Sequence, residues 1–251
     1  YYKKKFWRFF AYFLLAILAF FLFASWGLFG SMPSFEDLEN PDSNLATEVI
    51  SSDGVVLGKY FKTNRSQLKY SDLPKNLVEA LVATEDARFY EHSGIDLQSM
   101  AGVAVGILTG GGERGGGSTV SQQLAKNLFP REKTGIFQLP FVKLREWIMA
   151  VKLERNLTKE EIITLYLNTV PFSGISFGIE SASKEFFNKP PKALKIEEAA
   201  VLIGMLKANH RYNPKFNPEK SLSRRNTVLE QMNKYNFLSD DSVELLKNIP
   251  I

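Results

Sequence analysis

The chain has 251 residues, 45% of them hydrophobic, so it can bury the core of one globular domain and still has residues to spare. Its formal net charge of +4 is a weak indication of anionic partners such as phosphates or lipid headgroups. The absence of cysteine excludes disulfides, thiol nucleophiles and cysteine-based metal sites, and two histidines do not suffice for a histidine-rich metal centre.

A basic segment and then a strongly apolar one open the chain. Three lysines and an arginine lie within residues 3–8, and the 22 residues from 9 to 30 carry no charge. A helix of that length is about 33 Å long, enough to cross a bilayer. We expect residues 1–30 to be a cytoplasmic flank and one transmembrane anchor, with the rest outside. A cleaved signal peptide is the alternative, but no A-x-A site ends the run.

Residues 31–70 have the composition of an extracytoplasmic linker. Pro33 and Pro41 interrupt an acidic stretch, and two β-prone runs then flank Asp53-Gly54. An Asp-Gly pair between such runs is a strong signal of a β-hairpin. The linker is therefore predicted to contain one small hairpin.

Residues 71–251 are predicted to form one helical domain, and its most informative stretch is residues 83–96, ATEDARFYEHSGID. Ser71 or Asp72 is expected to cap the helix that precedes this stretch. Glu85 continues the apolar stripe of that helix, one turn beyond Leu81. An acid on such a stripe is partly removed from water, which suits it to proton transfer. A solvated acid at a helix end is the alternative.

A short apolar segment, residues 100–108, is predicted to be core or to dip into the outer leaflet. A glycine-rich loop follows it and leads into STVSQQLAKNLF. Thr119 and Gln122 have the spacing of a capping box at the start of a helix. A glycine loop before a helix N-terminus, with Lys126 nearby, can hold phosphate oxygens, although most such loops are only loops.

Residues 141–157 are predicted to form a central helix, because apolar residues line two of its sides. Glu146 lies in one of those stripes with Lys143 one turn before it. This acid is either functional or part of a structural Glu–Lys pair. Thr158 and Glu161 have the spacing of another capping box. After the hairpin no convincing strand is predicted, so the rest of the chain is expected to be helical.

Five motifs in order resemble the peptidoglycan glycosyltransferases, the family 51 glycosyltransferases found in class A penicillin-binding proteins and in monofunctional wall polymerases. The resemblance covers about residues 71–234. The first two motifs are intact, with Glu85, Asp86, Phe89, His92 and Gly94, then Gly116, Gly117, Ser118, Thr119, Gln122, Gln123, Lys126 and Asn127. The others give Lys143 and Glu146, then Lys159, Ile162, Tyr166, Leu167 and Asn168, then Arg224, Arg225, Val228 and Leu229. Val142 departs from the pattern, because the family usually has arginine there.

The resemblance implies a mainly α-helical, lysozyme-like glycosyltransferase domain with a membrane-proximal lobe. It implies polymerisation of lipid II into β-1,4 glycan strands, with inversion and release of polyprenyl pyrophosphate, for bacterial cell wall synthesis. Glu85 matches the base that takes the proton of the attacking hydroxyl, and Glu146 matches the second catalytic acid. The remaining matched positions are implied to bind substrate: Asp86, Phe89, His92, Gly117, Ser118, Thr119, Gln122, Gln123, Lys126, Asn127, Lys143, Tyr166, Asn168, Arg224 and Arg225.

The leaving pyrophosphate carries concentrated negative charge, so cations must meet it. Lys126 is the main candidate, with Lys143, Arg224 and Arg131 or Lys133 assisting. The resemblance requires no cofactor and no metal ligands in the protein, and leaves open a divalent ion, Mg²⁺ or Mn²⁺, at the pyrophosphate.

The resemblance also implies where the protein acts and with what. The expected partners are lipid II, the growing glycan chain, the membrane, cell-wall assembly proteins and a transpeptidase domain after Ile251, and no nucleic acid. The expected location is the bacterial cytoplasmic (inner) membrane, crossed once, with the catalytic domain on the periplasmic or extracellular side.

Two other functions fit parts of the sequence. A lytic muramidase also uses a glutamate in a lysozyme-like cleft, but it needs no pyrophosphate site. A non-catalytic membrane-anchored wall scaffold would keep the fold and lose the acids, whereas Glu85 and Glu146 are both present.

Overall fold

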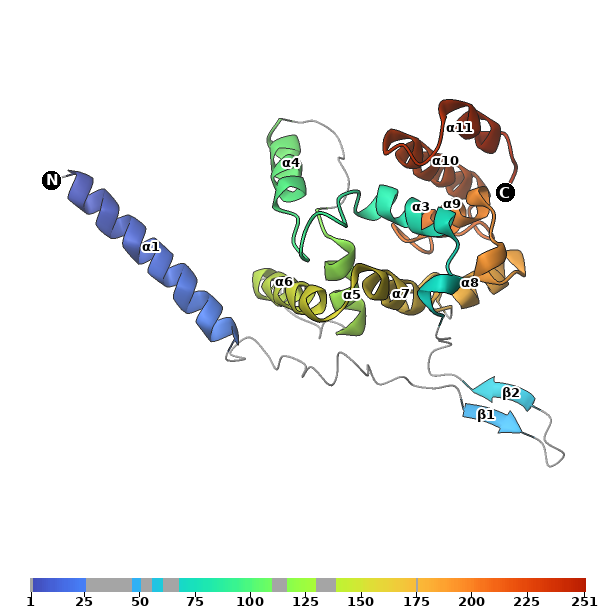
Figure 1. The fold of residues 1–251 in the computed structure, drawn as a ribbon, viewed down its shortest axis with the longest axis horizontal. Coiled ribbons are helices and arrows are strands. Elements are labelled where there is room, and N and C mark those ends of the chain that lie inside the picture. Colours follow the sequence, from blue (N-terminus) through green and yellow to red (C-terminus); the bar gives the residue numbers. More distant parts are fainter. Residues whose placement is uncertain are drawn as a thin grey trace.

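The computed structural model describes residues 2–25, 47–50, 56–60, 68–109, 117–129, 139–174 and 176–251. Helices dominate these ranges, and the sheet found within them has two strands. The mainly α-helical class predicted from the sequence is confirmed. Figure 1 shows most of the helices gathered into one body, while α1 and the two strands lie apart from it.

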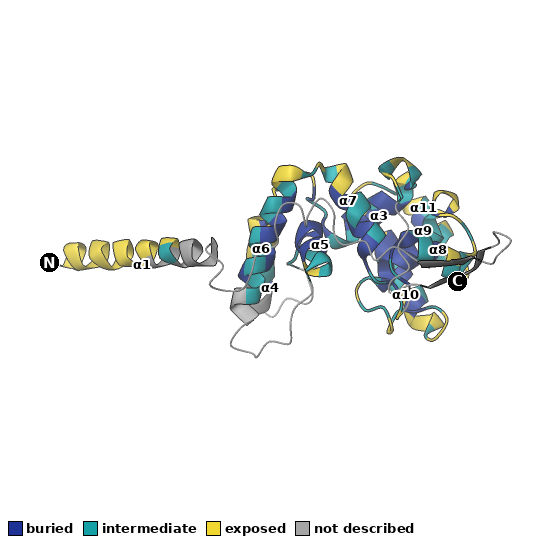
Figure 2. Ribbon diagram, turned by 90° about the horizontal axis from the view of Figure 1, so that it is seen from below, coloured by how far each residue is buried: buried dark blue, intermediate teal, exposed yellow. Residues whose placement is uncertain are grey.

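Helix α1 (Tyr2–Ser25) contains the basic flank and most of the predicted anchor. Its large apolar side chains, such as Phe9 and Leu15, are exposed, as the yellow ribbon in Figure 2 shows. Among the residues that the structure describes, no helix is both long and apolar enough to cross a membrane. Residues 26–30 of the predicted anchor lie outside the described residues.

The predicted hairpin forms. Strand β1 (Thr47–Ile50) pairs antiparallel with β2 (Val56–Tyr60), and Thr47 lies opposite Tyr60. The turn predicted at Asp53-Gly54 falls within residues 51–55, outside the described residues. The role of this hairpin as a linker stays a prediction.

Three helices make the centre of the body, where burial is greatest (Figure 2). Helix α3 (Lys75–Glu85) packs against α9 (Ile196–Met205) and α10 (Pro218–Lys234). The stripe predicted on α3 is buried, since Leu77 and Leu81 have no exposed surface. These contacts leave the last residue of α3, Glu85, at one end of the core.

A second group of helices lies beside this centre. Helix α5 (Val120–Leu128) packs on both α6 (Leu139–Asn156) and α7 (Lys159–Thr169). The capping box predicted at the start of α7 is confirmed, because the Thr158 hydroxyl accepts from the Glu161 N–H and the Glu161 carboxylate accepts from the Thr158 N–H at 2.7 Å. Helix α5 is thus held between two longer helices.

The start of α3 differs from the prediction. Its first flanking residue is Pro74, without a side-chain cap, and neither Ser71 nor Asp72 caps the helix. The Asp72 carboxylate instead accepts from the Lys69 N–H at 3.0 Å and closes the short 3-10 turn η1 (Tyr70–Asp72) before the helix.

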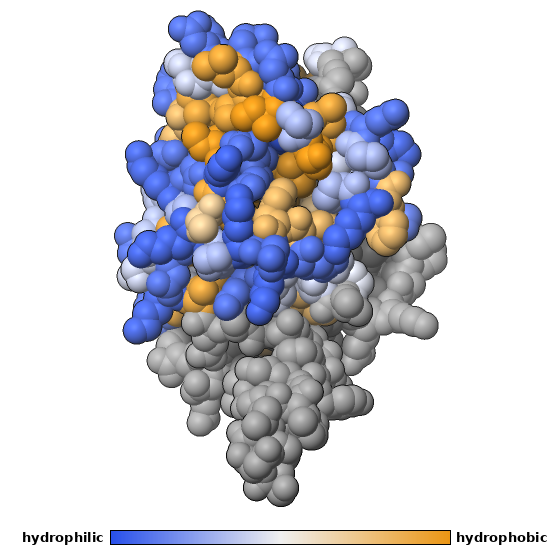
Figure 3. Space-filling view, turned by 90° about the vertical axis from the view of Figure 1, so that its right-hand side faces the viewer, coloured by the Kyte–Doolittle hydropathy of each residue, from blue (hydrophilic) through white to orange (hydrophobic). Residues whose placement is uncertain are grey.

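The other described elements are α4 (Leu97–Leu108), α8 (Ile179–Phe187), η3 (Pro191–Ala193) and α11 (Asp240–Lys247). Most of the predicted glycine-rich loop falls within residues 110–116, and Arg131 and Lys133 fall within residues 130–138, all outside the described residues. Figure 3 views the body from the right of Figure 1, where hydrophobic patches interrupt a mainly hydrophilic face.

Candidate active site

Glu85 ends α3 and is half-buried. The side-chain amide of Gln123, on α5, donates to Glu85 Oε2 at 2.9 Å. The hydroxyl of Tyr166, on α7, in turn donates to Gln123 Oε1 at 2.9 Å. Burial, and after it the charge of Glu85, raises the pKa of Tyr166 well above its usual value, so its hydroxyl stays protonated. Three helices therefore meet at this carboxylate.

The start of α5 is fixed by the carbonyl of Gly94. The Thr119 hydroxyl donates to this oxygen at 2.7 Å, and the Gln122 amide donates to it at 3.2 Å. Thr119 caps the helix as predicted, by accepting from the Gln122 N–H, but the Gln122 side chain bonds Gly94 rather than Thr119. Only half of the predicted capping box is therefore present.

Gly94 must be glycine for two reasons. Its φ of +92° is a conformation that L side chains rarely adopt, and a Cβ there would lie 2.8 Å from the backbone carbon of Ala150 on α6. The loop after α3 can press against α6 only because this residue has no side chain.

Asp86, the neighbour of Glu85, is turned into the protein. It is 6% exposed and both carboxylate oxygens lie 3.0 Å from His92 Nε2. It also accepts from the N–H of Val120, the first residue of α5, at 2.9 Å. A carboxylate is favourable at this helix N-terminus. One of the N–H groups at the helix end predicted to receive phosphate oxygens therefore already binds a carboxylate of the protein itself.

Lys143 and Glu146 form the pair that their spacing predicts. The Lys143 ammonium lies 3.1 Å from Glu146 Oε2 and donates to the Ser118 hydroxyl at 2.9 Å. Glu146 is only 7% exposed, so this second acid is buried, whereas the side chain of its counter-charge, Lys143, is 35% exposed. Gly117, the residue before Ser118, faces Val103 of α4.

Helix α5 joins the two acids. Its Gln123 holds Glu85, and Ser118, just before the helix, holds the lysine that pairs with Glu146. Lys126 is exposed in the last turn of α5, beside the half-buried Asn127. One short helix and the residue two positions before it thus link a half-buried acid, a buried acid with a partly exposed lysine, and an exposed cation.

Comparison with known proteins shows the family to which this chain belongs. A family model described as Transglycosylase matches residues 53–233. The chain belongs to the transglycosylase family. Penicillin-binding protein 1A of Pseudomonas aeruginosa is 35% identical over 221 residues, which are 88% of this chain and 26% of that protein. Penicillin-binding protein 1F of Bacillus subtilis is 37% identical over 195 residues, 77% of this chain and 27% of that protein.

The chain thus spans about a quarter of the length of these curated relatives. Among solved structures, penicillin-binding protein 1A of Haemophilus influenzae is similar at 21% identity and a TM-score of 0.48, with 83% of this chain and 21% of that chain covered. The resemblance stated from the motifs is confirmed, and this transglycosylase is a peptidoglycan glycosyltransferase domain of the class A penicillin-binding protein kind.

The two arginines of the fifth motif lie in different surroundings in this transglycosylase. Arg225 is 1% exposed and donates to the carbonyls of Lys247 and Ile249, so it fastens the end of α11 to α10. Arg224 is half-buried, with its guanidinium 5.9 Å from the Tyr212 ring. Within the described ranges, its buried Nε has no hydrogen-bond partner. Of the two, Arg224 is the one suited to an anion.

Two more of the predicted site residues make contacts within the body. The Asn168 amide exchanges two hydrogen bonds with the backbone of Leu68, at 3.2 and 3.0 Å. Phe89 is fully buried, with the Lys159 ammonium 4.3 Å from its ring centroid. Both side chains therefore position the elements around the site.

One acid of this region is absent from the sequence prediction. Glu154 accepts from the Ser121 hydroxyl at 2.5 Å and pairs with Lys159 at 2.7 Å. Lys159 also donates to the carbonyl of His92 at 2.7 Å. Glu154 belongs to none of the motifs, and the break between α6 and α7 separates it from Lys159, so helical spacing does not reveal the pair.

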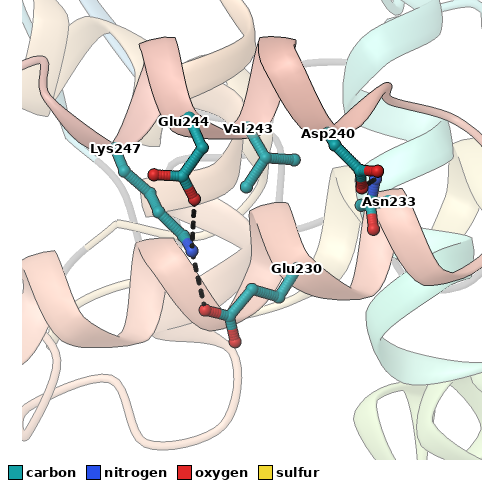
Figure 4. Close-up of a pocket in the computed structure, with 6 residues that line it drawn as sticks. All are labelled: Glu230, Asn233, Asp240, Val243, Glu244 and Lys247. Atoms are coloured by element: carbon teal, nitrogen blue, oxygen red, sulfur yellow. Dashed lines mark hydrogen bonds and ion pairs between the residues drawn. The ribbon is translucent and has the colours of Figure 1, made fainter.

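A cavity of about 280 Å³ lies between α10 and α11, away from Glu85. In Figure 4, Lys247 points between two acids, 3.1 Å from Glu230 and 3.4 Å from Glu244, and Asn233 donates to Asp240 at 2.8 Å. These acids already have partners. Elsewhere too, the described part of the chain contains no group of three or more His, Cys, Asp or Glu side chains that could hold a metal ion.

Proposed function

We propose that this transglycosylase polymerises lipid II, using Glu85 as the base and cations around α5 for the leaving pyrophosphate. The observation that carries the proposal is that α5 and the segment just before it serve both acids: Gln123 donates to Glu85, and Ser118 accepts from Lys143, which pairs with Glu146. A half-buried carboxylate and the partly exposed lysine of a Lys–Glu pair, held from the two ends of this segment, provide a proton acceptor and positive charge.

In the proposed reaction, the 4-hydroxyl of the acceptor sugar gives its proton to Glu85. Its oxygen forms the new bond to the anomeric carbon of the donor as the bond from that carbon to the pyrophosphate oxygen breaks, so the configuration inverts. The proton then leaves Glu85 for water. Support for Glu85 comes from its half-buried position and from a carboxylate oxygen, Oε1, for which no partner is found within the described ranges.

The leaving pyrophosphate is proposed to meet Lys126, Lys143 and Arg224. Lys126 is exposed and Arg224 half-buried. Lys143 uses one N–H on Ser118 and one on Glu146, so a third remains for the phosphate oxygens. Glu146 is then the group that holds Lys143 in place. A divalent ion at the pyrophosphate is an additional proposal that these residues do not require.

We propose that the enzyme is anchored in the bacterial cytoplasmic membrane by residues 1–30, with a lysozyme-like domain outside it. The uncharged run from 9 to 30 and the basic residues before it support the anchor. Helix α4 exposes Leu97 and Val105, which suits a lobe that touches lipid. A following transpeptidase domain and cell-wall assembly proteins are proposed partners, by analogy with the relatives.

The test is to incubate the full chain in detergent with fluorescent lipid II and to separate the products by gel electrophoresis. A polymerase gives a ladder of glycan strands, and Glu85→Gln gives none. Glu79→Gln is the matched control, because this acid lies on the same helix and pairs with Lys75 at 3.1 Å.

The two alternatives give different results in the same assay. A muramidase would leave lipid II unused and shorten preformed glycan strands. A scaffold would do neither, whatever stands at position 85.

A further inference from the structure

Glu85, Gln123 and Tyr166 form a directional chain of hydrogen bonds across three helices. The Tyr166 hydroxyl donates to Gln123 Oε1 at 2.9 Å, and Gln123 Nε2 donates to Glu85 Oε2 at 2.9 Å. The residues are separated by 38 and 43 positions in the sequence, so tertiary packing alone brings them together.

The direction of this chain follows from the chemistry of each group. An ionised carboxylate can only accept, so the group of Gln123 that faces Glu85 must be the amide nitrogen. The amide oxygen then faces Tyr166, whose hydroxyl must donate. A reversed amide would set its oxygen against the carboxylate and leave no donor between them.

The Tyr166 hydroxyl stays protonated and therefore remains a hydrogen-bond donor. The side chain is 1% exposed, and burial and the nearby charge of Glu85 keep its pKa well above the usual value. A buried hydroxyl without a partner is costly, so the bond to Gln123 is strongly preferred. The bond from the Tyr166 hydroxyl therefore holds the Gln123 amide in one orientation.

The consequence for Glu85 is a fixed carboxylate. One oxygen is tied to Gln123, and the other, Oε1, has no hydrogen-bond partner within the described part of the chain. We infer that Tyr166 and Gln123 are positioning residues, which orient Glu85 so that Oε1 faces the acceptor hydroxyl. This inference rests on the proposed function for the role of Glu85, and it gives Tyr166 and Gln123 a task other than binding substrate.

The kinetic test uses the full chain with lipid II. Tyr166→Phe removes only the hydroxyl and should lower kcat about tenfold, and Gln123→Met, of similar length, should lower it about 10- to 100-fold. KM should stay within about twofold in both, since neither change removes a substrate contact. In the Gln123→Met background, Tyr166→Phe should add less than about a twofold change, because it acts through Gln123.

Tyr70→Phe is the matched control. It removes a tyrosine hydroxyl that takes no part in the hydrogen bonds from Tyr166 to Gln123 and from Gln123 to Glu85, and kcat should not change. A rise in KM with unchanged kcat in Tyr166→Phe would overturn the inference in favour of substrate binding. If the losses in kcat of the two single variants added fully in the double variant, Tyr166 would not act through Gln123, and this part of the inference would be overturned.

A second measurement separates this inference from the proposed function. In protein labelled with ¹⁵N-glutamine, the Gln123 side-chain amide, assigned by its loss in Gln123→Met, should exchange slowly with water. Tyr166→Phe and Glu85→Ala should each make that exchange fast. If the wild-type chain does not polymerise lipid II but the amide behaves in this way, the proposed function fails and the hydrogen-bond chain stands. If the exchange rate of the Gln123 amide does not change in Tyr166→Phe, the proposed series of hydrogen bonds is overturned, whatever the activity.

Discussion

Two neighbouring acids show how the surroundings of a residue decide its role. Asp86 is buried and bonded to His92 and Val120, so its oxygens are occupied. Glu85 is half-buried and, within the described part of the chain, receives one hydrogen bond, from Gln123. A proton acceptor needs an oxygen that substrate can reach, and Glu85 offers one where Asp86 does not.

At the residue scale, Glu85→Gln is expected to abolish polymerisation and to keep the fold. A general base contributes about 10²- to 10⁴-fold to a rate, and an amide cannot accept the proton. The thermal midpoint should stay close to that of the wild type, because Gln can still accept a bond from Gln123. Glycan synthesis near the wild-type rate would show that Glu85 is not the base.

Lys126 gives the second prediction at this scale. It is exposed on α5, so Lys126→Ala should leave the thermal midpoint almost unchanged. Charge grows on the pyrophosphate in the transition state, so turnover of lipid II should fall strongly. Lys126→Arg should restore only part of the turnover, since a planar guanidinium does not replace a compact ammonium. Wild-type turnover by Lys126→Ala would remove this residue from the site and reopen the muramidase alternative.

The sequence predicts the local contacts of the site and not the distant ones. The Lys143–Glu146 pair and the Thr119 cap follow from helical spacing of three residues. The bond from Gln123 to Glu85 spans 38 residues, and no spacing rule reaches that far. For the same reason, the adjacent arginines 224 and 225 look alike in sequence, although only Arg225 is bonded to the end of α11.

At the element scale, the start of α4 is tied by Asp96. Its carboxylate accepts from the Ser99 N–H at 2.9 Å, from the Ser99 hydroxyl at 2.6 Å and from Arg88. Burial raises the pKa of Asp96, but the bonds from Ser99 and the charge of Arg88 outweigh it and lower the pKa from 3.8 to about 2. The ionised form is therefore the one that the fold stabilises.

This lowered pKa sets an acid limit to stability. The ionised Asp96 contributes fully to the free energy of unfolding above its unfolded pKa of 3.8. This contribution is lost as the pH falls through about 2. Urea unfolding between pH 5 and about 2 should show this loss, and it should be smaller in Asp96→Asn. The variant should be less stable at neutral pH and approach the wild type at the acid end. Parallel curves across the whole range would contradict the assignment.

The loop between α3 and α4 depends on Gly94. Gly94→Ala places a methyl group 2.8 Å from the Ala150 backbone at a φ of +92°, so we expect a loss of about 2–4 kcal/mol in the free energy of unfolding. Gly102→Ala is the matched control, because nothing lies within 4 Å of that position and alanine favours a helix by about 1 kcal/mol. Equal effects of the two changes in chemical unfolding would disprove the close-approach argument.

At the scale of the whole molecule, the chain is a helical body with an apolar helix and a hairpin apart from it (Figure 1). The helical class, the helix over residues 141–157 and the hairpin could be predicted, since each depends on a periodic or local pattern. The central place predicted for that helix is not confirmed, because α6 lies beside the centre made by α3, α9 and α10, and the stripe with Trp147 and Ile148 is only half-buried. The packing of α3 against α9 and α10 could not, because any buried stripe can meet any other. The sequence therefore predicts the elements well and their partners poorly.

The family match begins at residue 53, so residues 1–30 lie outside it. Removal of residues 1–30 is expected to leave a folded protein with the thermal midpoint of the full chain. The truncated protein should bind lipid vesicles more weakly in flotation assays, because about 22 uncharged residues are lost. Polymerisation should slow most at dilute lipid II and recover at high concentration, since the proposed anchor would raise the local concentration of a membrane-bound substrate without touching the reacting atoms. A truncated protein with full vesicle binding and unchanged rates at dilute substrate would show that the body alone, with α4, holds the enzyme at the bilayer.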